Sequence, residues 1–131
     1  MDQIANNLIM IIGGDTHFTY LMQRYVRTSA HQIVFTTLGE DVLARAKCEK
    51  PVAIVLVVDP PESIGWHTLQ VLKTDQEVGK TPVIVCSWMD EEAQSFELGA
   101  DYYLRMPILY ADFEAALASI WLKEQDEKSI E

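Results

Sequence analysis

The stretch VAIVLVVDPPESIG, residues 52–65, decides the fold class. Its first part, residues 52–58, is continuously apolar and lacks the polar alternation of a strand that has one face in water. A strand buried on both faces of a parallel sheet has this pattern. An aspartate and two prolines, residues 59–61, then end the run, because proline has no backbone N–H to donate to a neighbouring strand. We therefore predict a central strand here, with Gly65 just before or within the start of the following helix.

Strand and helix patterns alternate on both sides of this run. Apolar and β-branched residues mark the strands, whereas apolar residues at helical spacing with charges between them mark the helices. The expected strands are residues 8–12, 31–37, 52–58, 82–87 and 102–105, and the expected helices are residues 17–30, 40–50, about 65–72, 90–98 and 108–122. This alternation implies right-handed crossovers and a parallel sheet. We expect a (βα)5 doubly wound α/β domain, a five-stranded parallel sheet flanked by helices on both faces.

The last expected helix has one apolar face, and a polar tail follows it. The apolar residues recur at spacings of four, four and three: Leu109, Phe113, Leu117 and Ile120. This spacing marks the face that packs on the sheet. The tail KEQDEKSIE, residues 123–131, is polar enough to fray or to stay disordered. We therefore expect a single domain over residues 1–122 and a polar C-terminal tail after it.

Composition restricts the classes of partner. With 131 residues, of which 49% are apolar and 23% charged, the chain is typical of one soluble globular domain. Ten basic and twenty acidic side chains give a formal net charge of -10, which repels a phosphate backbone, so we expect no nucleic-acid partner. The apolar run at residues 8–12 is too short to span a bilayer, so we expect no membrane association and a cytoplasmic location. Cys48 and Cys86 lack the spacing of a disulfide framework or a zinc site.

Two longer segments carry a family resemblance. KPVAIVLVVDPPESIGWHTLQVLK, residues 50–73, and KTPVIVCSWMDEEAQSFELGADYYLRMPI, residues 80–108, resemble the receiver domain of two-component response regulators. The resemblance extends over roughly residues 8–122. Its most specific part is TPVIVCS followed by ELGADYYLRMP, in which the serine, the Gly-Ala-Asp run and the residue-proline pair have the spacing of the family.

The resemblance implies a site at the carboxyl ends of the strands, where open α/β sheets place their ligands. In the family, two acidic residues after the first strand and an aspartate at the end of the third strand bind Mg²⁺, and that aspartate accepts a phosphoryl group. A serine or threonine after the fourth strand and a lysine before a proline after the fifth strand contact the phosphoryl oxygens. Mg²⁺ prefers hard oxygen ligands, and the transferred group needs its negative charge neutralised.

This sequence departs from the family at the acidic pair and at the phosphoacceptor. Gly13 and Gly14 stand where the family has its acidic pair, and Asp15 follows them. Counting back from Pro61 and Gly65 places Val57 at the phosphoacceptor position. A valine cannot form an acyl phosphate.

The positions that contact the phosphoryl group are only partly kept. Ser87 keeps the hydroxyl, but Met106 stands where the family has its lysine, before Pro107. We therefore predict a pseudo-receiver that acts without phosphorylation, with no catalytic residue, no metal ion and no cofactor, and that is not an enzyme.

Two alternatives stay open at this point. Asp59 lies two residues after Val57, so in an extended strand it points to the same face about 6 to 7 Å further on. An active receiver phosphorylated at Asp59 is the first alternative. The loop at Gly13 and Gly14 lies between a strand and a helix, where backbone N–H groups attract anions. A binding site there for a small anion or a nucleotide is the second.

The expected partner is another protein. The resemblance implies that Ser87 and Tyr103 form the pair that moves together on activation, and that the face of the fourth helix, fifth strand and fifth helix mediates dimerisation and signalling. Trp88, Arg105 and Tyr110 are the other candidates on that face, and aromatic residues are enriched at protein interfaces. A second copy of the chain is one candidate partner.

Overall fold

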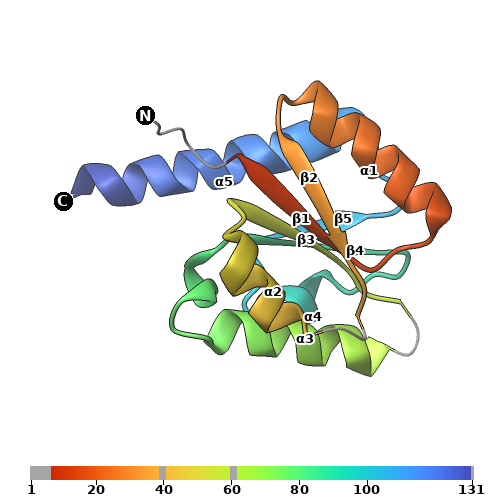
Figure 1. Cartoon of the computed structure of the whole chain (residues 1–131), viewed down its shortest axis with the longest axis horizontal. Coiled ribbons are helices and arrows are strands. Elements are labelled where there is room, and N and C mark those ends of the chain that lie inside the picture. Colours follow the sequence, from red (N-terminus) through yellow and green to blue (C-terminus); the bar gives the residue numbers. More distant parts are fainter. Residues whose placement is uncertain (1–6, 39–40, 60–61, 131) are drawn as a thin grey trace.

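The computed structural model describes residues 7–38, 41–59 and 62–130 and has the expected strand and helix order (Figure 1). The strands are β1 (Leu8–Ile12), β2 (Gln32–Thr36), β3 (Ala53–Val57), β4 (Val83–Ser87) and β5 (Tyr102–Arg105). The helices are α1 (Thr16–Thr28), α2 (Val42–Glu49), α3 (Glu62–Thr74), α4 (Glu92–Glu97) and α5 (Tyr110–Ile130), and a 3-10 turn, η1 (Val78–Lys80), precedes β4. Glu40, Pro60 and Pro61, used above for a helix start, a strand end and an alignment, lie outside the described residues.

The strands form one parallel sheet in the order β2-β1-β3-β4-β5. The continuously apolar strand β3 is the central one, as predicted, and all of its residues are buried. The fold class is therefore confirmed. Because the chain leaves β1 toward β2 on one side and β3 toward β4 on the other, the loops after β1 and β3 diverge. Such a switch point leaves a crevice at the carboxyl ends of the strands.

Helices cover both faces of the sheet, with α1 and α5 on one face and α2, α3 and α4 on the other (Figure 1). Successive strand residues point to opposite faces. In β3, Val55 and Val57 join the core cluster that includes α1 and α5, whereas Ile54 and Leu56 join the cluster that includes α2 and α3. Val57 therefore points to the face that α1 covers.

Gly65 lies within α3 and allows the helix to approach the sheet closely. A Cβ atom added at this position would lie 3.0 Å from Cγ2 of Val58, which is tighter than ordinary van der Waals contact. Gly65 therefore sets how near the N-terminal part of α3 lies to the chain that leaves β3.

The end of the chain differs from the sequence prediction in two ways. Leu109 was expected on the packed face of the last helix, but it lies just before α5 and is 63% exposed, while Ile108 takes the buried position. Phe113, Leu117 and Ile120 are buried as expected. The helix was expected to end at residue 122, but its backbone continues to Ile130. The tail residues include Lys, Glu and Gln, which have good helix propensity, and this explains the continuation.

The turn η1 was not predicted. Asp75 accepts hydrogen bonds from the backbone N–H groups of Glu77 (2.9 Å) and Val78 (2.8 Å), and so it holds the chain in a tight turn before β4.

Among the described helices, none combines the length and the apolar character that crossing a bilayer requires.

Candidate functional site: an apolar cavity at the carboxyl ends of the strands

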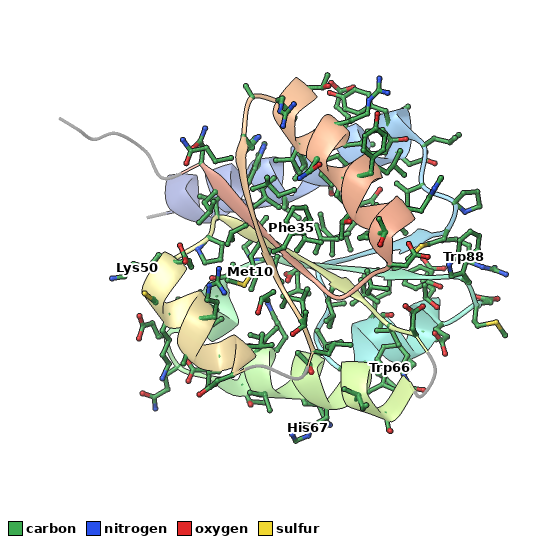
Figure 2. All side chains as sticks on the ribbon, turned by 45° about the vertical axis from the view of Figure 1, so that its right-hand side comes forward. Met10, Phe35, Lys50, Trp66, His67 and Trp88 are labelled. Carbon is green, nitrogen blue, oxygen red and sulfur yellow. The ribbon has the colours of Figure 1, made fainter. Side chains whose placement is uncertain are left out.

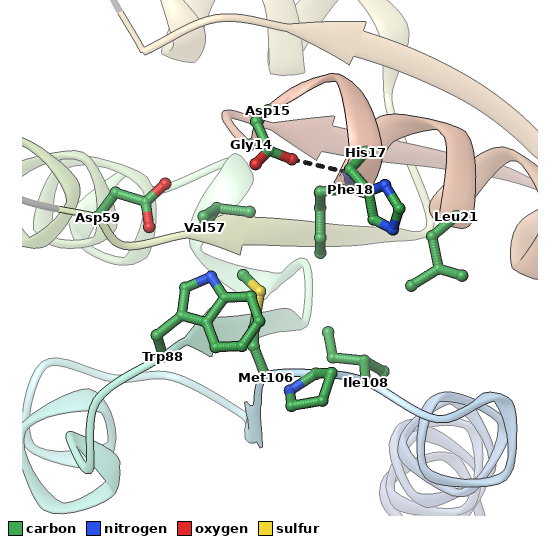
Figure 3. Close-up of a pocket in the computed structure, with 11 residues that line it drawn as sticks. Gly14, Asp15, His17, Phe18, Leu21, Val57, Asp59, Trp88, Met106 and Ile108 are labelled. Carbon is green, nitrogen blue, oxygen red and sulfur yellow. Dashed lines mark hydrogen bonds between the residues drawn. The ribbon is translucent and has the colours of Figure 1, made fainter.

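A cavity of about 260 Å³ lies at the switch point between the loops that follow β1 and β3 (Figure 3). Residues from both of these loops, from α1 and from the segments after β4 and β5 line it. The lining residues are Gly14, Asp15, His17, Phe18, Leu21, Val57, Asp59, Trp88, Met106, Pro107 and Ile108. Five positions that the sequence singled out as a degenerate phosphorylation pocket are therefore brought together here: Gly14, Asp15, Val57, Asp59 and Met106.

The turn after β1 is built from two glycines with positive φ angles, 85° at Gly13 and 94° at Gly14. An added Cβ atom at Gly14 would lie 2.5 Å from Cδ2 of Phe18, so the turn packs directly on the first turn of α1. Asp15 caps that helix, because its carboxylate accepts a hydrogen bond from the backbone N–H of Phe18 at 2.8 Å. The helix N-terminus, where an anion would bind, thus already faces a carboxylate. Gly13 does not line the cavity; its N–H donates to the carbonyl of Thr36 at 3.0 Å.

Val57 ends β3 and is 1% exposed. It forms part of the cavity wall, where its two methyl groups offer neither a nucleophile nor a metal ligand. Asp59 is partly buried and lines the same cavity, as its spacing of two residues from Val57 indicates. The two residues therefore reach one cavity from the same strand end.

Met106 and Pro107 complete the wall on the side of β5. Met106 is buried, and its backbone N–H donates to the carbonyl of Ser87 at 2.8 Å. The peptide bond between Met106 and Pro107 is cis. The apolar thioether of Met106 thus lies beside the cavity at the position where the resemblance expects a lysine.

Ser87 is buried and does not line the cavity. Its hydroxyl donates a hydrogen bond to the Oε1 atom of Glu91 at 2.7 Å and accepts one from the backbone N–H of Met89 at 3.0 Å. Both partners belong to the segment between β4 and α4, residues 88–91, which we call the β4–α4 loop. Ser87 therefore stabilises this loop and does not face the cavity.

Two side chains of β5 hold the same loop. The hydroxyl of Tyr103 donates to the carbonyl of Met89 and accepts a hydrogen bond from the backbone N–H of Glu91 at 3.1 Å. The Nε atom of Arg105 donates to the carbonyl of Trp88 at 2.8 Å. The side chain of Trp88 projects outward from this end of the molecule (Figure 2). Ser87, Trp88, Tyr103 and Arg105, which the sequence proposed as interaction or switch residues, are thus joined in one network.

Tyr110 lies elsewhere. Its ring packs edge to face against Tyr25 of α1, with the ring centroids 5.3 Å apart. Its hydroxyl donates a hydrogen bond to the carboxylate of Glu114 at 3.4 Å. Partial desolvation and the negative charge of this carboxylate both raise the pKa of Tyr110. Tyr110 therefore belongs to the contact between α1 and α5.

Sequence reasoning missed several residues of the site. Phe18, Leu21 and Ile108 supply much of the apolar wall, and Glu91 is the partner of Ser87. Ser87 ends β4 and Glu91 lies before α4, so their contact depends on the path of the loop between them, and no helical spacing in the sequence indicates it.

The charge of the cavity lining is negative. Asp15 and Asp59 carry carboxylates, and no lysine or arginine from the described part of the chain lines the cavity. In the described residues, no group of three or more His, Cys, Asp and Glu side chains is placed to hold a metal ion. The lining therefore offers apolar contact and negative charge.

Sequence comparison finds relatives among response regulators. Over 118 residues the chain is 28% identical to the alkaline phosphatase synthesis transcriptional regulatory protein PhoP of Bacillus subtilis, and this alignment covers 88% of this chain and 48% of PhoP. Over 115 residues it is 27% identical to protein PilH of Pseudomonas aeruginosa, and this alignment covers 86% of this chain and 93% of PilH. The chain spans about half the length of PhoP and of several other curated relatives that it matches. No family model matches the chain.

Solved structures share the fold. The signal receiver domain of a putative Luxo repressor protein from Vibrio parahaemolyticus has a TM-score of 0.80 at 20% identity and covers 97% of this chain and 98% of its own. The chemotaxis protein CheY4 of Vibrio cholerae has a TM-score of 0.76 at 15% identity and covers 88% of this chain and 98% of its own. The solved structures show the fold of the chain, and the sequence comparison shows which proteins are its relatives. The chain thus has homologues among response regulators and shares its fold with receiver domains.

Proposed function

We propose that the chain is a receiver that works without phosphorylation and signals by binding another protein. The observation that carries this proposal is the pair Val57 and Met106. Both side chains line the cavity at the positions where the resemblance expects the phosphoacceptor and the lysine. A phosphoryl group placed there would have no carboxylate on Val57 to form a bond with and no ammonium group to offset its charge.

Phosphodonor treatment tests the first half of the proposal. The protein is incubated with acetyl phosphate and Mg²⁺, and separately with beryllofluoride and Mg²⁺, alongside a phosphorylatable receiver as a positive control. We expect no phosphoryl adduct in the intact mass and no beryllofluoride binding at millimolar concentration. An adduct that is lost in Asp59→Asn would instead establish Asp59 as the phosphoacceptor. An active receiver phosphorylated at Asp59 is the second candidate function, because Asp59 lines the cavity.

The variant Val57→Asp sharpens this test. It returns a carboxylate to the third strand, but Gly13 and Gly14 still supply no metal ligand and Met106 still supplies no positive charge. We expect no adduct from this single change. Phosphorylation of Val57→Asp at the new carboxylate would show that the rest of the pocket is still competent, and it would contradict the proposal.

The β4–α4 loop supports the second half of the proposal. Trp88 and Met89 are 56% and 57% exposed although both are large and apolar. Aromatic residues and methionine are enriched in the cores of protein interfaces. The loop carries them on a backbone that is held by three side chains, so little conformational entropy is lost when a partner covers them.

A matched pair of variants tests this surface. We propose that the face of α4, β5 and α5 binds a protein, with a second copy of the chain as the first partner to examine. Light scattering over a range of concentrations measures the oligomeric state of the protein, of Trp88→Ala and of Tyr20→Ala. Tyr20 is 59% exposed on α1 and serves as the control. We expect Trp88→Ala alone to weaken self-association or partner capture; equal effects of both changes would rule out this surface.

A further inference from the structure

The cavity has the size and the walls of a ligand site. Phe18, Val57, Met106 and Ile108 are buried apolar side chains that line it. Apolar cavities of roughly 150 Å³ hold a benzene ring, so the volume of about 260 Å³ found here has room for a two-ring ligand with a short side chain. A ligand that fills it would remove apolar surface from water on both partners.

The charges around the cavity select the sign of that ligand. Asp15 and Asp59 lie on the side of the β1 and β3 loops, and Trp88 and Met106 lie across from them (Figure 3). Among the described residues, the exposed imidazole of His17 is the only basic side chain of the lining. With a formal net charge of -10 on the whole chain, an anion is repelled at long range and again at the site, whereas a cation is attracted.

We propose that this cavity binds a small aromatic amine, with its ring against Phe18, Val57 and Met106 and its ammonium group toward the carboxylates of Asp15 and Asp59. Recognition of this ligand would differ from recognition of a phosphoryl group in two ways. The aromatic ring of the ligand would occupy the space of the metal ion and phosphoryl group, and the ligand would carry a positive charge where a phosphoryl group carries a negative one. The ligand would touch Trp88 at the start of the β4–α4 loop, so its binding has a direct route to the surface that we propose for protein contact.

Paired probes test the proposal. Tryptamine and indole-3-acetate share the two-ring indole and differ in the sign of their charge, and methylamine carries the charge without the ring. Isothermal titration calorimetry gives the affinities, and NMR shifts of the backbone amides of Gly14, Val57 and Ile108 place the ligand. The experiment contains neither phosphodonor nor Mg²⁺, so its outcome is separate from that of the phosphorylation tests. We expect tryptamine to bind at the cavity at least about tenfold more tightly than indole-3-acetate.

Charge-neutralising variants with a matched control show which carboxylates act. Asn can cap a helix as Asp does, so Asp15→Asn removes the charge and keeps the cap. Asp41 caps α2 in the same way, through the backbone N–H of Ala44 at 3.1 Å, and does not line the cavity. We expect Asp15→Asn and Asp59→Asn each to weaken tryptamine binding by roughly threefold to fivefold. Asp41→Asn should leave it unchanged.

Met106→Lys provides a test that does not depend on a weak charge effect. The new ammonium group would stand in the cavity wall and repel the amine, while its aliphatic stem replaces the thioether chain. We expect tryptamine binding to be lost in this variant, with circular dichroism confirming that it is folded. Three results would each overturn the proposal: no shift of cavity amides at millimolar tryptamine, binding of indole-3-acetate as tight as that of tryptamine, or equal loss in Asp15→Asn and Asp41→Asn.

Discussion

At the scale of single residues, Ser87 stands where the resemblance expects a hydroxyl beside the phosphoryl group, and in this structure it stabilises a loop. Ser87 is buried, and its hydroxyl joins the Glu91 carboxylate to the Met89 backbone. The single hydroxyl proton is donated to Glu91, so Ser87 can donate a hydrogen bond to a ligand only if that bond breaks. Any switching of Ser87 therefore requires the β4–α4 loop to move with it.

The variant Ser87→Ala measures the worth of that link. It removes the hydroxyl and leaves the Glu91 carboxylate and the Met89 N–H without this partner. We expect the free energy of unfolding to fall by roughly 1 to 3 kcal/mol, measured by urea denaturation. Thr74→Ala is the control, because the exposed Thr74 hydroxyl only bonds the Gln70 carbonyl of its own helix. A loss no larger than that of the control would mean that the loop does not depend on Ser87.

At the scale of elements, a partly buried ion pair joins α3 to the β4–β5 end of the sheet. The Oδ2 atom of Asp101 accepts hydrogen bonds from the Lys73 ammonium at 2.9 Å and from the backbone N–H of Val83 at 2.8 Å. The Lys73 ammonium also donates to the carbonyl of Thr81 at 3.0 Å. One aspartate just before β5 thus bonds the last turn of α3 and the first residue of β4.

The variant Asp101→Ala should therefore be far costlier than loss of a surface pair. The side chains of Lys73 and Asp101 are only 14% and 23% exposed, so the change leaves a mostly buried ammonium group without its counter-charge. We expect a loss of about 3 kcal/mol in the free energy of unfolding. The control Glu49→Ala disrupts the more exposed pair of Arg45 and Glu49 in α2 and should cost less than about 0.5 kcal/mol.

The turn η1 supplies a pH-dependent contribution to stability. The hydrogen bond from the Val78 N–H is the largest influence that lowers the pKa of Asp75, followed by the Glu77 N–H and the nearby Lys47. Because the folded state holds the pKa below its ordinary value of 3.8, the stabilisation is present above that pH and is lost as the pH falls through the folded-state pKa.

The variant Asp75→Asn checks this sign. We expect it to destabilise the protein at pH 7 and to have a smaller effect at pH 3, as measured by chemical denaturation at both values. Asp90→Asn, an exposed carboxylate in the β4–α4 loop, is the control. An effect of Asp75→Asn that grows on acidification would contradict the assignment.

At the scale of the whole molecule, like charges act against compactness. A formal net charge of -10 on 131 residues raises the electrostatic energy of the folded state, and salt screens this repulsion over about 10 Å at 0.1 M. We expect the thermal midpoint to rise by a few degrees between low salt and 0.2 M sodium chloride. A neutral osmolyte at matched osmolality is the control, and a midpoint that falls with salt would show that attractive ion pairs dominate instead.

The sequence alone predicts much of this architecture. Strands β1 and β5 lie where they were predicted, because apolar runs between turn residues record burial directly. The meeting of Asp15, Val57, Asp59 and Met106 was predictable, because the carboxyl ends of parallel strands share one edge. Leu109 was misplaced, because its spacing continues that of the helix while the chain enters α5 only at Tyr110. The bond between Ser87 and Glu91 was missed, because it depends on the path of a loop.

The hydrogen bonds that hold the β4–α4 loop should also protect it from proteolysis. A protease must draw its substrate into an extended strand and bond the backbone on both sides of the cut. The carbonyls of Trp88 and Met89 are engaged by Arg105 and Tyr103, and the N–H of Met89 is engaged by Ser87. The exposed aromatic residue Trp88 is thus protected from cleavage by the hydrogen bonds of its own loop, and chymotrypsin should cut there only as fast as the loop opens.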